Sequence, residues 1–309
     1  ENLWRLPYLE NVDLRQNDIT ELPAWLFDAS RERTQVINLR QNPLSAATRR
    51  KVLDYRRQRG VGMGVYEDDI ARLNEQAARA LWMPDSRLAD SPRKETIWQM
   101  LKDEPRSDGL FKLLAELRGT ADSEHVREDM AQRVWRVLEA SSQRADLAEE
   151  VFERAATPFN CDDGAAVSFS ALEILVEISD ARKQIEGGQL SARPLLALGR
   201  GLFRLDRLER IALNHSLNHP GTDPLEVSLA LRTGLASRFY LPGQPRHMRY
   251  ARLSGVTPAA LSEAELQVKA AEVSPALLRF LNELPFWTDY LKRAYATRFS
   301  QLYAPFETR

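Results

Sequence analysis

Cysteine is almost missing from this chain, because Cys161 is the single thiol among 309 residues. A lone thiol excludes an intramolecular disulfide and a metal site built from thiolates, and it is typical of a reducing compartment. A basic excess is missing too, since 43 basic side chains balance 44 acidic ones to a formal net charge of -1. This balance argues against a protein that binds nucleic acid.

Long hydrophobic runs are also missing. No apolar stretch approaches the roughly 18 residues that span a bilayer, and no basic-then-apolar signal peptide opens the chain. We therefore expect no membrane span. The chain begins at Glu1 instead of Met, which favours a piece of a longer protein.

Cofactor and metal motifs are not found in the sequence. There is no Walker motif and no dinucleotide-binding glycine pattern. His215 and His219 have the spacing of a zinc motif, but Ser216 stands where that motif has glutamate. We expect neither a metal nor a cofactor.

A repeat occupies the first 60 residues. The tetrapeptide Leu-Arg-Gln-Asn occurs at 14–17 and again at 39–42, a spacing of 25, with alternating apolar residues before each copy. Period and motif match a leucine-rich repeat, and they outweigh the alternative of two unrelated amphipathic strands. In this pattern the asparagine turns inward and binds backbone groups at the bend. About three repeats are needed for a solenoid core, so we expect the C-terminal end of a longer array.

Two domains are predicted, in a mainly α fold. Residues 1–60 hold the repeats and a helical cap over Ser45–Arg59, with Ser45 as its N-cap. Glycines at 60, 62 and 64 form a flexible joint. Residues 65–309 read as an all-α domain, because apolar residues recur at three- and four-residue spacing. The expected helices include Ser123–Ser141, Val167–Ile185, Leu190–Leu217, Asp223–Phe239 and Phe286–Tyr303.

Cys161 is the main candidate for chemistry. It follows a predicted loop and precedes a predicted helix, whose N-terminus favours a thiolate. Asp162 and Asp163 oppose ionisation of the thiol, because like charges repel. Asp163 is better suited to a second step, in which an amine attacks an acyl group on Cys161 and loses a proton. The segment thus favours a transfer enzyme.

Structural interpretations of the same residues stay open. A lone cysteine is often a small buried hydrophobe, and the two aspartates can be helix caps. A cysteine–histidine dyad is possible, although no protease signature surrounds Cys161. The charged segment Leu198–Glu209 reads as solvated ion pairs more readily than as a basic face near the thiol. The aromatic residues of 286–299 read as core.

Four motifs follow the leucine-rich repeat in order, and together with it they resemble the bacterial novel ubiquitin ligases of the IpaH type. The motifs are Cys161-x-Asp163, Leu198-Gly199-Arg200 with Leu202–Asp206 and Leu208-Glu209, Asp223–Val227 with Leu241-Pro242, and Phe286-Trp287-x-x-Tyr290-Leu291. The resemblance covers essentially the whole chain and implies an all-helical catalytic domain behind the end of a repeat solenoid.

The resemblance also implies an activity. Cys161 would accept ubiquitin from a host ubiquitin-conjugating enzyme as a thioester, and a lysine of a host protein would then attack it. Asp163 would serve that second step, with Arg200, Arg204 and Asp206 as supporting residues. The repeats would select the substrate. Family members are virulence effectors that type III secretion delivers into the host cytoplasm.

One position departs from the family pattern. Family members commonly carry arginine directly after the Cys-x-Asp triplet, where this chain has Gly164. Arg200 or Arg204 is a candidate replacement for the missing positive charge. Two other functions remain as alternatives: a non-catalytic repeat module that only binds, and a cysteine hydrolase that acts on ubiquitin.

Overall fold

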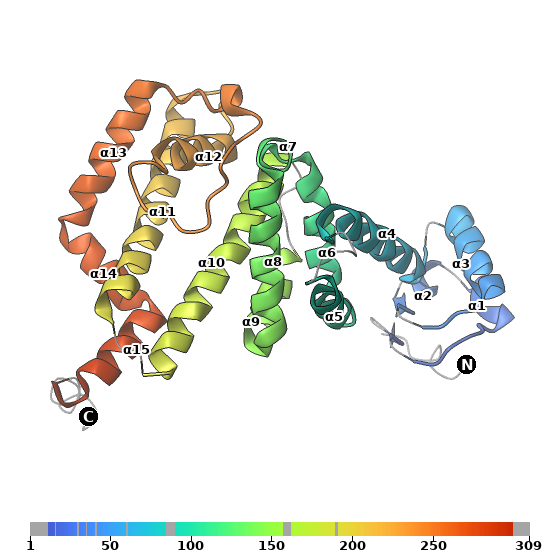
Figure 1. The fold of residues 1–309 in the computed structure, drawn as a ribbon. Coiled ribbons are helices and arrows are strands. Elements are labelled where there is room, and N and C mark those ends of the chain that lie inside the picture. The colour runs from blue at the N-terminus through green and yellow to red at the C-terminus, as the bar shows by residue number, and fades with distance from the viewer. Residues whose placement is uncertain are drawn as a thin grey trace, which may run out of the picture. The chain divides into compact units, whose positions relative to one another are not determined.

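A computed structural model describes residues 12–15, 17–29, 31–34, 36–40, 42–59, 61–84, 90–156, 162–188 and 191–298 (Figure 1). Its elements are β1 (Val12–Asp13), α1 (Ala24–Asp28), α2 (Arg31–Thr34), β2 (Ile37–Asn38), α3 (Ala46–Arg59), α4 (Val65–Trp82), α5 (Ser91–Lys102), α6 (Asp108–Glu116), η2 (Leu117–Gly119), α7 (Ala121–His125), α8 (Arg127–Gln143), α9 (Ala145–Ala155), α10 (Asp162–Glu186), α11 (Ala192–Asn218), α12 (Pro224–Leu235), η3 (Ala251–Ser254), α13 (Pro258–Glu272), α14 (Pro275–Glu283) and α15 (Pro285–Ala294). The chain divides into two compact units, Glu1–Ala77 and Ala78–Arg309.

The first unit holds the two described strands. β1 and β2 pair in parallel, with Val12 opposite Ile37. The buried amide of Asn42 donates to the carbonyl oxygens of Leu14 at 2.8 Å and Leu39 at 2.9 Å. The asparagine therefore binds backbone groups of both successive segments, which is the contact that the repeat pattern predicts.

The helical cap of the first unit begins as the sequence predicts. The hydroxyl of Ser45 accepts the backbone N–H of Thr48 at 3.1 Å, which identifies Ser45 as the N-cap of α3. Val52 and Tyr55 of α3 are buried against the strands. The phenol of Tyr55 is 3.0 Å from the hydroxyl of Thr34 and donates to the carbonyl oxygen of Ala29 at 3.0 Å.

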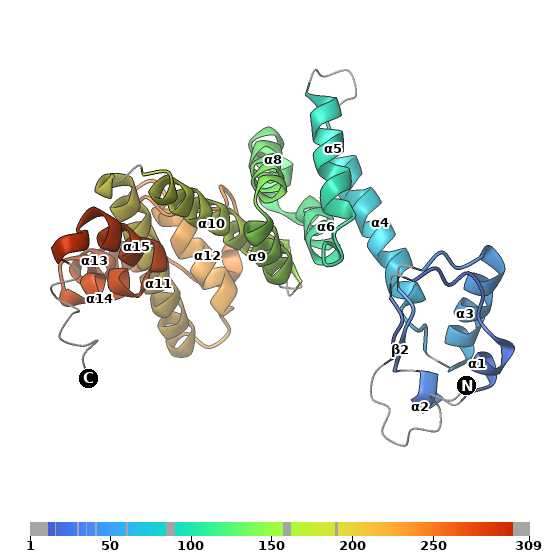
Figure 2. The ribbon, with the colours of Figure 1, turned by 90° about the horizontal axis from the view of Figure 1, so that it is seen from below.

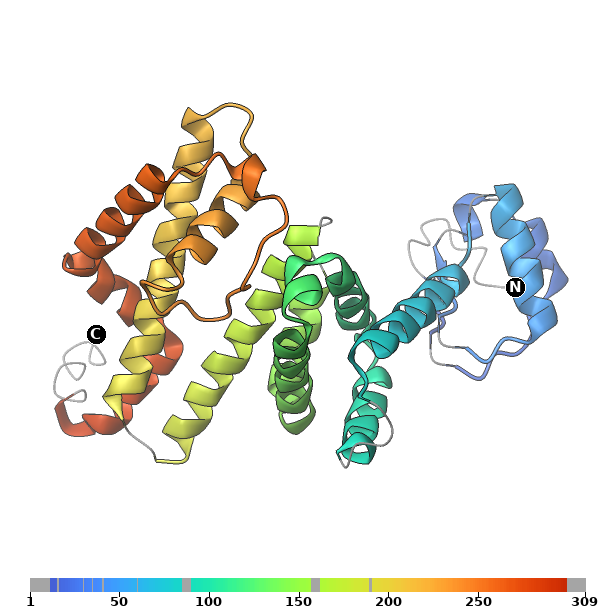
Figure 3. The ribbon, with the colours of Figure 1, turned by 45° about the horizontal axis from the view of Figure 1, so that its top comes forward.

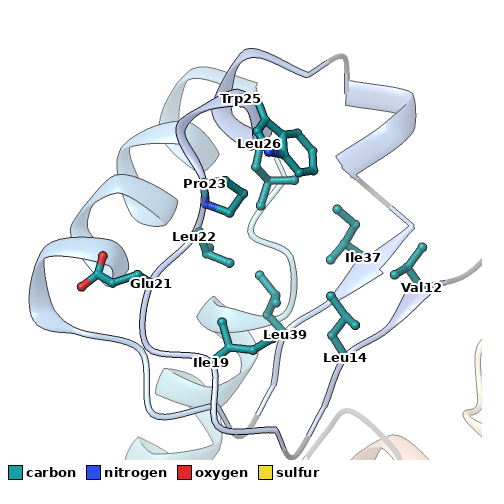
Figure 4. A pocket seen from close by; sticks show the side chains of 10 residues that line it. All are labelled: Val12, Leu14, Ile19, Glu21, Leu22, Pro23, Trp25, Leu26, Ile37 and Leu39. Atoms are coloured by element: carbon teal, nitrogen blue, oxygen red, sulfur yellow. The ribbon is translucent and has the colours of Figure 1, made fainter. Parts of the chain in front are cut away.

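An apolar pocket of about 240 Å³ opens between the strands and α1 of this unit. In Figure 4 its apolar side chains come from the two strand segments, from α1 and from the segment that leads into α1, whereas the side chain of Glu21 points away from them. The lining residues are Val12, Leu14, Ile19, Glu21, Leu22, Pro23, Trp25, Leu26, Ile37 and Leu39. Nine of these ten side chains carry no charge, so the pocket suits apolar contacts.

All the regular elements among the described residues of the second unit are helices, which confirms the mainly α fold class. Helices α8, α9 and α10 run side by side in Figures 1 and 2, and α5 and α6 pack on them. Their shared core includes Trp98, Leu114, Leu138 and Phe169, all fully buried. The indole of Trp82 donates to the carbonyl oxygen of Leu114 at 2.7 Å, which ties the end of α4 to this core.

Helix α10 links two cores because it is long enough to reach both. Its first half, with Phe169, belongs to the core above, whereas Ile185 near its end packs with Leu195 of α11 and Phe286 of α15. A third core joins α11, α12 and α13. Helix α10 is therefore held by packing at both ends, and its N-terminus belongs to a helix that is fixed along its length.

Several predicted helices have different limits in the structure; α12, for example, ends at Leu235 and not at Phe239. Residues 123–141 form two helices, because Val126 adopts φ −139° and ψ 46° between α7 and α8. Apolar spacing continues across this break, so the periodicity alone did not reveal it. Helix α10 begins at Asp162, five residues earlier than predicted, because Ala165 and Ala166 are buried in its first turns despite Gly164.

The C-terminal aromatic residues follow the core prediction in part. Phe286 and Tyr290 are buried, but Tyr295 is 54% exposed, and Phe299 lies outside the described residues. Helix α15 ends at Ala294, earlier than the predicted Tyr303. Among the described residues, no helix is both long and apolar enough to cross a bilayer.

Candidate functional site

The predicted site lies where α10 begins. Cys161 lies outside the described residues, whereas Asp163 is the second residue of α10. The side chain of Asp163 is fully buried, at 0% exposed. From the sequence we expected this carboxylate either to cap its own helix or to act on a substrate amine. In the structure it binds a segment far along the chain, and its action on an amine stays a prediction.

Two backbone N–H groups bind Asp163. Arg249 donates its N–H to Oδ1 at 2.8 Å, and Tyr250 donates to Oδ2 at 2.8 Å. Both donors belong to residues 240–250, the segment between α12 and η3, which we name the strap. In Figure 3 the strap is the orange loop that extends from α12 toward α10.

A second buried aspartate holds the strap in the same way. Asp122 of α7 is 2% exposed and accepts the N–H groups of Arg246 at 3.0 Å and His247 at 2.7 Å. Each of the two carboxylates therefore accepts a pair of consecutive backbone N–H groups, and the two pairs of donors lie three residues apart along the strap. Hydrogen bonds between ionised acceptors and backbone N–H groups are the stronger kind, so the strap has two firm anchor points.

Arg133 of α8 compensates the charge at the first anchor. Its guanidinium donates to Asp122 at 2.7 Å and to Glu173 of α10 at 2.6 Å and 2.8 Å. Burial acts to lower the pKa of Arg133, but the hydrogen bonds and charges of Glu173 and Asp122 outweigh it and raise that pKa. Arg133 thus stays charged and joins α7, α8 and α10 beneath the strap.

The first five residues of the strap, 240–244, bind α10 and α12. The phenol of Tyr240 donates to Glu177, and the N–H of Gly243 donates to the same carboxylate at 3.3 Å. Buried Arg232 of α12 donates to the side chain of Gln244 at 2.8 Å and to the hydroxyl of Ser170 at 2.8 Å. The strap is therefore bound along its length to α10 as well as to α7.

Gly243 allows this close approach, and its replacement gives a test of the strap. Gly243 has φ +56°, and a Cβ there would collide with the carbonyl oxygen of Ser170 and lie 2.9 Å from Ile174. We expect Gly243→Ala to lower the free energy of unfolding by about 3 kcal/mol, from left-handed strain plus overpacking. Gly188→Ala is the matched control, because Gly188 has φ +78° and meets no described atom within 4 Å. Equal losses in urea unfolding of the two variants would contradict the packed strap.

Glu226 of α12 completes the surroundings of Asp163. It is 4% exposed, and its Oε2 atom has no hydrogen-bond partner among the described residues. Burial raises the pKa of Glu226 to about 8, and three further effects act in the same direction: the charge of Asp163, a side-chain hydrogen bond with Asp163 and the charge of Asp223. Burial beside another acid therefore favours the neutral form of this glutamate.

The three supporting residues predicted on α11 have partners on α13, on the strap and on α11 itself. Arg200 and Arg204 both bind Glu272 of α13, at 3.1 Å and 2.9 Å, and Arg204 also donates to the carbonyl oxygen of Tyr240. Asp206 pairs with Arg210 one turn along the helix. Both pairs join two helices, and the side chains of Arg204 and Glu272 are 14% and 7% exposed, unlike the solvated pairs that the sequence favoured, whereas Arg200 is 43% exposed. None of these contacts reaches Asp163, so a role near the thiol stays a prediction.

The histidines form two separate pairs. His125 and His247 have ring centroids 5.4 Å apart, and His247 lies 3.4 Å from Asp122. The rings of His215, in the last turn of α11, and His219, the C-cap of that helix, stack with centroids 4.0 Å apart. Whether any of them approaches Cys161 is untested, because that thiol is outside the described residues.

Sequence reasoning missed most of the residues around Asp163. Glu226 stood inside a recognised motif, but no role was assigned to it. Leu241-Pro242 of the strap belonged to the same motif, again with no role assigned, and Asp122 and Arg133 were not singled out at all. The one available signal was Pro242-Gly243 with Pro245, which excludes a helix there and marks a constrained connection.

Comparisons with known proteins agree on a family. The family model described as "C-terminal novel E3 ligase, LRR-interacting" matches residues 82–298. The chain is 29% identical over 299 residues to the E3 ubiquitin-protein ligase ipaH3 of Shigella flexneri, which covers 93% of this chain and 50% of that protein. It is 28% identical over 307 residues to ipaH9.8 of Shigella flexneri serotype X, covering 96% of this chain and 54% of the relative.

A third relative, ipaH7.8 of Shigella flexneri, is 30% identical over 224 residues, which cover 71% of this chain and 38% of that protein. The chain thus spans about half the length of the curated relatives with the longest matches. The matched region includes Asp163, the strap and Glu226. Because the family model matches most of the chain, the protein belongs to the C-terminal novel E3 ligase family.

Proposed function

We propose that this chain is the catalytic part of a cysteine-dependent ubiquitin ligase, with Cys161 as the acceptor of ubiquitin. The observation that carries the proposal is the family match over residues 82–298, which contain the single cysteine of the chain. The relatives are named E3 ubiquitin-protein ligases. A nucleophilic thiol is the chemistry that a covalent transfer enzyme requires.

The proposed reaction has two steps. The thiolate of Cys161 attacks the carbonyl carbon of the thioester that joins ubiquitin to a conjugating enzyme, and the thiolate of that enzyme leaves. The ε-amine of a substrate lysine then attacks the new thioester, a C–N bond forms, the C–S bond breaks, and the Cys161 thiolate leaves. The amine loses a proton in this second step, and a carboxylate is a suitable acceptor for it.

Asp163 is the proposed carboxylate for the second step. Its burial and its two strap donors mean that direct proton acceptance requires the strap to release it. The two backbone N–H groups that donate to Asp163 support the assignment, because such donors stabilise a carboxylate, the form that a base requires. Gly164 carries no charge beside Asp163, which leaves Arg200 and Arg204 as proposed sources of positive charge.

Asparagine at position 163 separates the two steps. We expect Asp163→Asn to load ubiquitin on Cys161 but to transfer it to free lysine about 100-fold more slowly, as for a lost general base. The measurement is single-turnover discharge of preformed thioester. Because asparagine also turns an NH₂ group toward a strap N–H, thermal unfolding of the same variant must be followed. Discharge at the wild-type rate from a folded variant would remove Asp163 as the base.

The partners follow from the same proposal. They are ubiquitin, a host ubiquitin-conjugating enzyme and a host protein that the leucine-rich repeats select. The relatives come from Shigella, and this supports the proposal of a virulence effector that type III secretion delivers into the host cytoplasm.

The test is a reaction of the protein with ubiquitin, activating enzyme, a panel of conjugating enzymes and ATP. A ubiquitin adduct that reductant removes supports the ligase, together with lysine-linked products. If no conjugating enzyme gives an adduct, the proposal fails, and the repeat-only binding module becomes the better account. Release of free ubiquitin from conjugates would instead favour the cysteine hydrolase.

A further inference from the structure

The carboxyl group of Glu226 faces a charge problem that the fold must solve. It is buried, its side chain forms a hydrogen bond with that of Asp163, and its Oε2 atom has no partner among the described residues. Helices α10 and α12, which carry these two residues, pack together. An ionised carboxylate without donors is very costly in such a place, so a buried acid of this kind keeps its proton.

Asp163 is the partner that can receive this proton in a hydrogen bond. Its oxygens already accept the N–H groups of Arg249 and Tyr250, so Asp163 is the member of the pair that has donors for a negative charge. A carboxylate has about four lone-pair positions, so it can also accept a carboxylic O–H. One proton between the two carboxyl groups then replaces their mutual repulsion with a hydrogen bond.

We propose that Glu226 is a positioning residue for the transfer step. It keeps its proton and donates a hydrogen bond through it to Asp163, which holds Asp163 ionised and fixed at the start of α10. This inference rests on the proposed function. It assigns Glu226 no contact with the substrate. The strap N–H groups and the Glu226 O–H together surround Asp163 with donors from two different elements.

The charged groups near Glu226 favour this protonation state. The two that act on it are both acids, Asp163 of α10 and Asp223 at the start of α12. Charges on the neighbouring elements have other partners: Glu209 of α11 accepts the hydroxyl of Ser228, and Arg249 of the strap donates to Glu124. Arg252 on η3 is exposed.

The stability of the protein gives the first test. Folding raises the pKa of Glu226 from 4.5 to about 8, so the stabilisation from its proton is full below pH 4.5 and is lost as pH rises to about 8. Glu226→Gln keeps the shape and an N–H donor but has no proton to lose. We expect the melting temperature of Glu226→Gln minus that of wild type to rise by about 5 °C between pH 5 and pH 8, then to level off.

Exposed Glu263 supplies the matched control. Glu263→Gln removes the same charge from the surface of α13, and we expect its melting-temperature difference from wild type to change little between pH 5 and pH 9. A Glu226→Gln difference that is equally flat would overturn the proposal. This arm needs no ubiquitin, so it stands even if the protein proves not to be a ligase.

The transfer rate gives the second test. Each protein is first loaded with ubiquitin on Cys161, and discharge to free lysine is followed from pH 6.5 to pH 9.5. We expect Glu226→Ala to be about 10-fold slower or more at pH 7, as for one lost hydrogen bond to a charged group, while Glu226→Gln stays near wild type. The ratio of Glu226→Gln to wild type rises above pH 8, because only the wild type then loses the proton.

Using the ratio cancels the ionisation of the lysine and the spontaneous hydrolysis of the thioester, which are common to both proteins. A Glu226→Gln variant that is as slow as Glu226→Ala at pH 7 would identify Glu226 as an ionised group in the reaction and overturn the proposal. A ratio that stays constant to pH 9.5 would overturn it too. Failure of wild type itself to load ubiquitin would be a failure of the proposed function, while the stability arm still decides the protonation of Glu226.

Discussion

Replacing Cys161 with alanine is expected to abolish ubiquitin transfer, with the rate falling about 10⁴-fold or more to the uncatalysed background. The chain offers no second thiol, so no neighbouring cysteine can take over the acyl group. Both steps are lost together, since without a thioester there is nothing for the lysine to attack. The measurement is formation of ubiquitin–lysine products by wild type and variant with one conjugating enzyme.

The control for this variant is its stability. A cysteine-to-alanine change removes one sulfur atom, and we expect the free energy of unfolding to change by less than about 1.5 kcal/mol. Wild-type activity in Cys161→Ala would contradict the covalent mechanism. If Cys161→Ala fails to fold, the same activity measurement is made with a second variant, Cys161→Ser, which keeps the size of the side chain.

The largest effect on stability is expected at Arg133. Arg133→Ala leaves Asp122 and Glu173 as buried carboxylates without their common cation, and breaking such a pair typically costs about 4 kcal/mol. For a unit of this size that loss corresponds to a fall of about 10 °C in melting temperature. Because Asp122 also anchors the strap, we expect the strap to become more accessible to protease in this variant.

Arg182 provides the matched control for Arg133. It makes a single pair with Glu150 between two helices, at 2.9 Å, and both side chains are more than a third exposed. Arg182→Ala should cost less than about 1 kcal/mol, as exposed pairs do. Similar melting temperatures for the Arg133→Ala and Arg182→Ala proteins would show that the buried network does not hold the strap.

Helix positions were largely predictable from the sequence, because apolar spacing reports the buried face of each helix locally. The break at Val126 was not, since a backbone turn can occur without any change in that spacing. The early start of α10 was not either, because burial of Ala165 and Ala166 outweighs the low helix propensity of Gly164.

The candidate site was likewise predictable from the sequence only in part. Asp163 was predicted from local context, as a carboxylate two residues from a lone cysteine. Its actual partners, Arg249 and Tyr250, lie more than 80 positions away, and both contribute backbone N–H groups. Every residue except proline has such a group, so the sequence carries no mark of which ones bind Asp163. The neutral state of Glu226 is hidden for a related reason, because it depends on burial beside an acid from another helix.

The central claim is that the sulfur of Cys161 carries ubiquitin as a thioester, and intact mass spectrometry of a single-turnover reaction tests it most directly. Purified conjugating enzyme charged with ubiquitin is mixed with the protein, quenched in acid without reductant, and digested to locate the modified residue. We predict a mass gain of one ubiquitin at Cys161 that a thiol reductant reverses and that Cys161→Ala lacks. Lysine-linked products formed by wild type with no such intermediate at any reaction time would contradict the account.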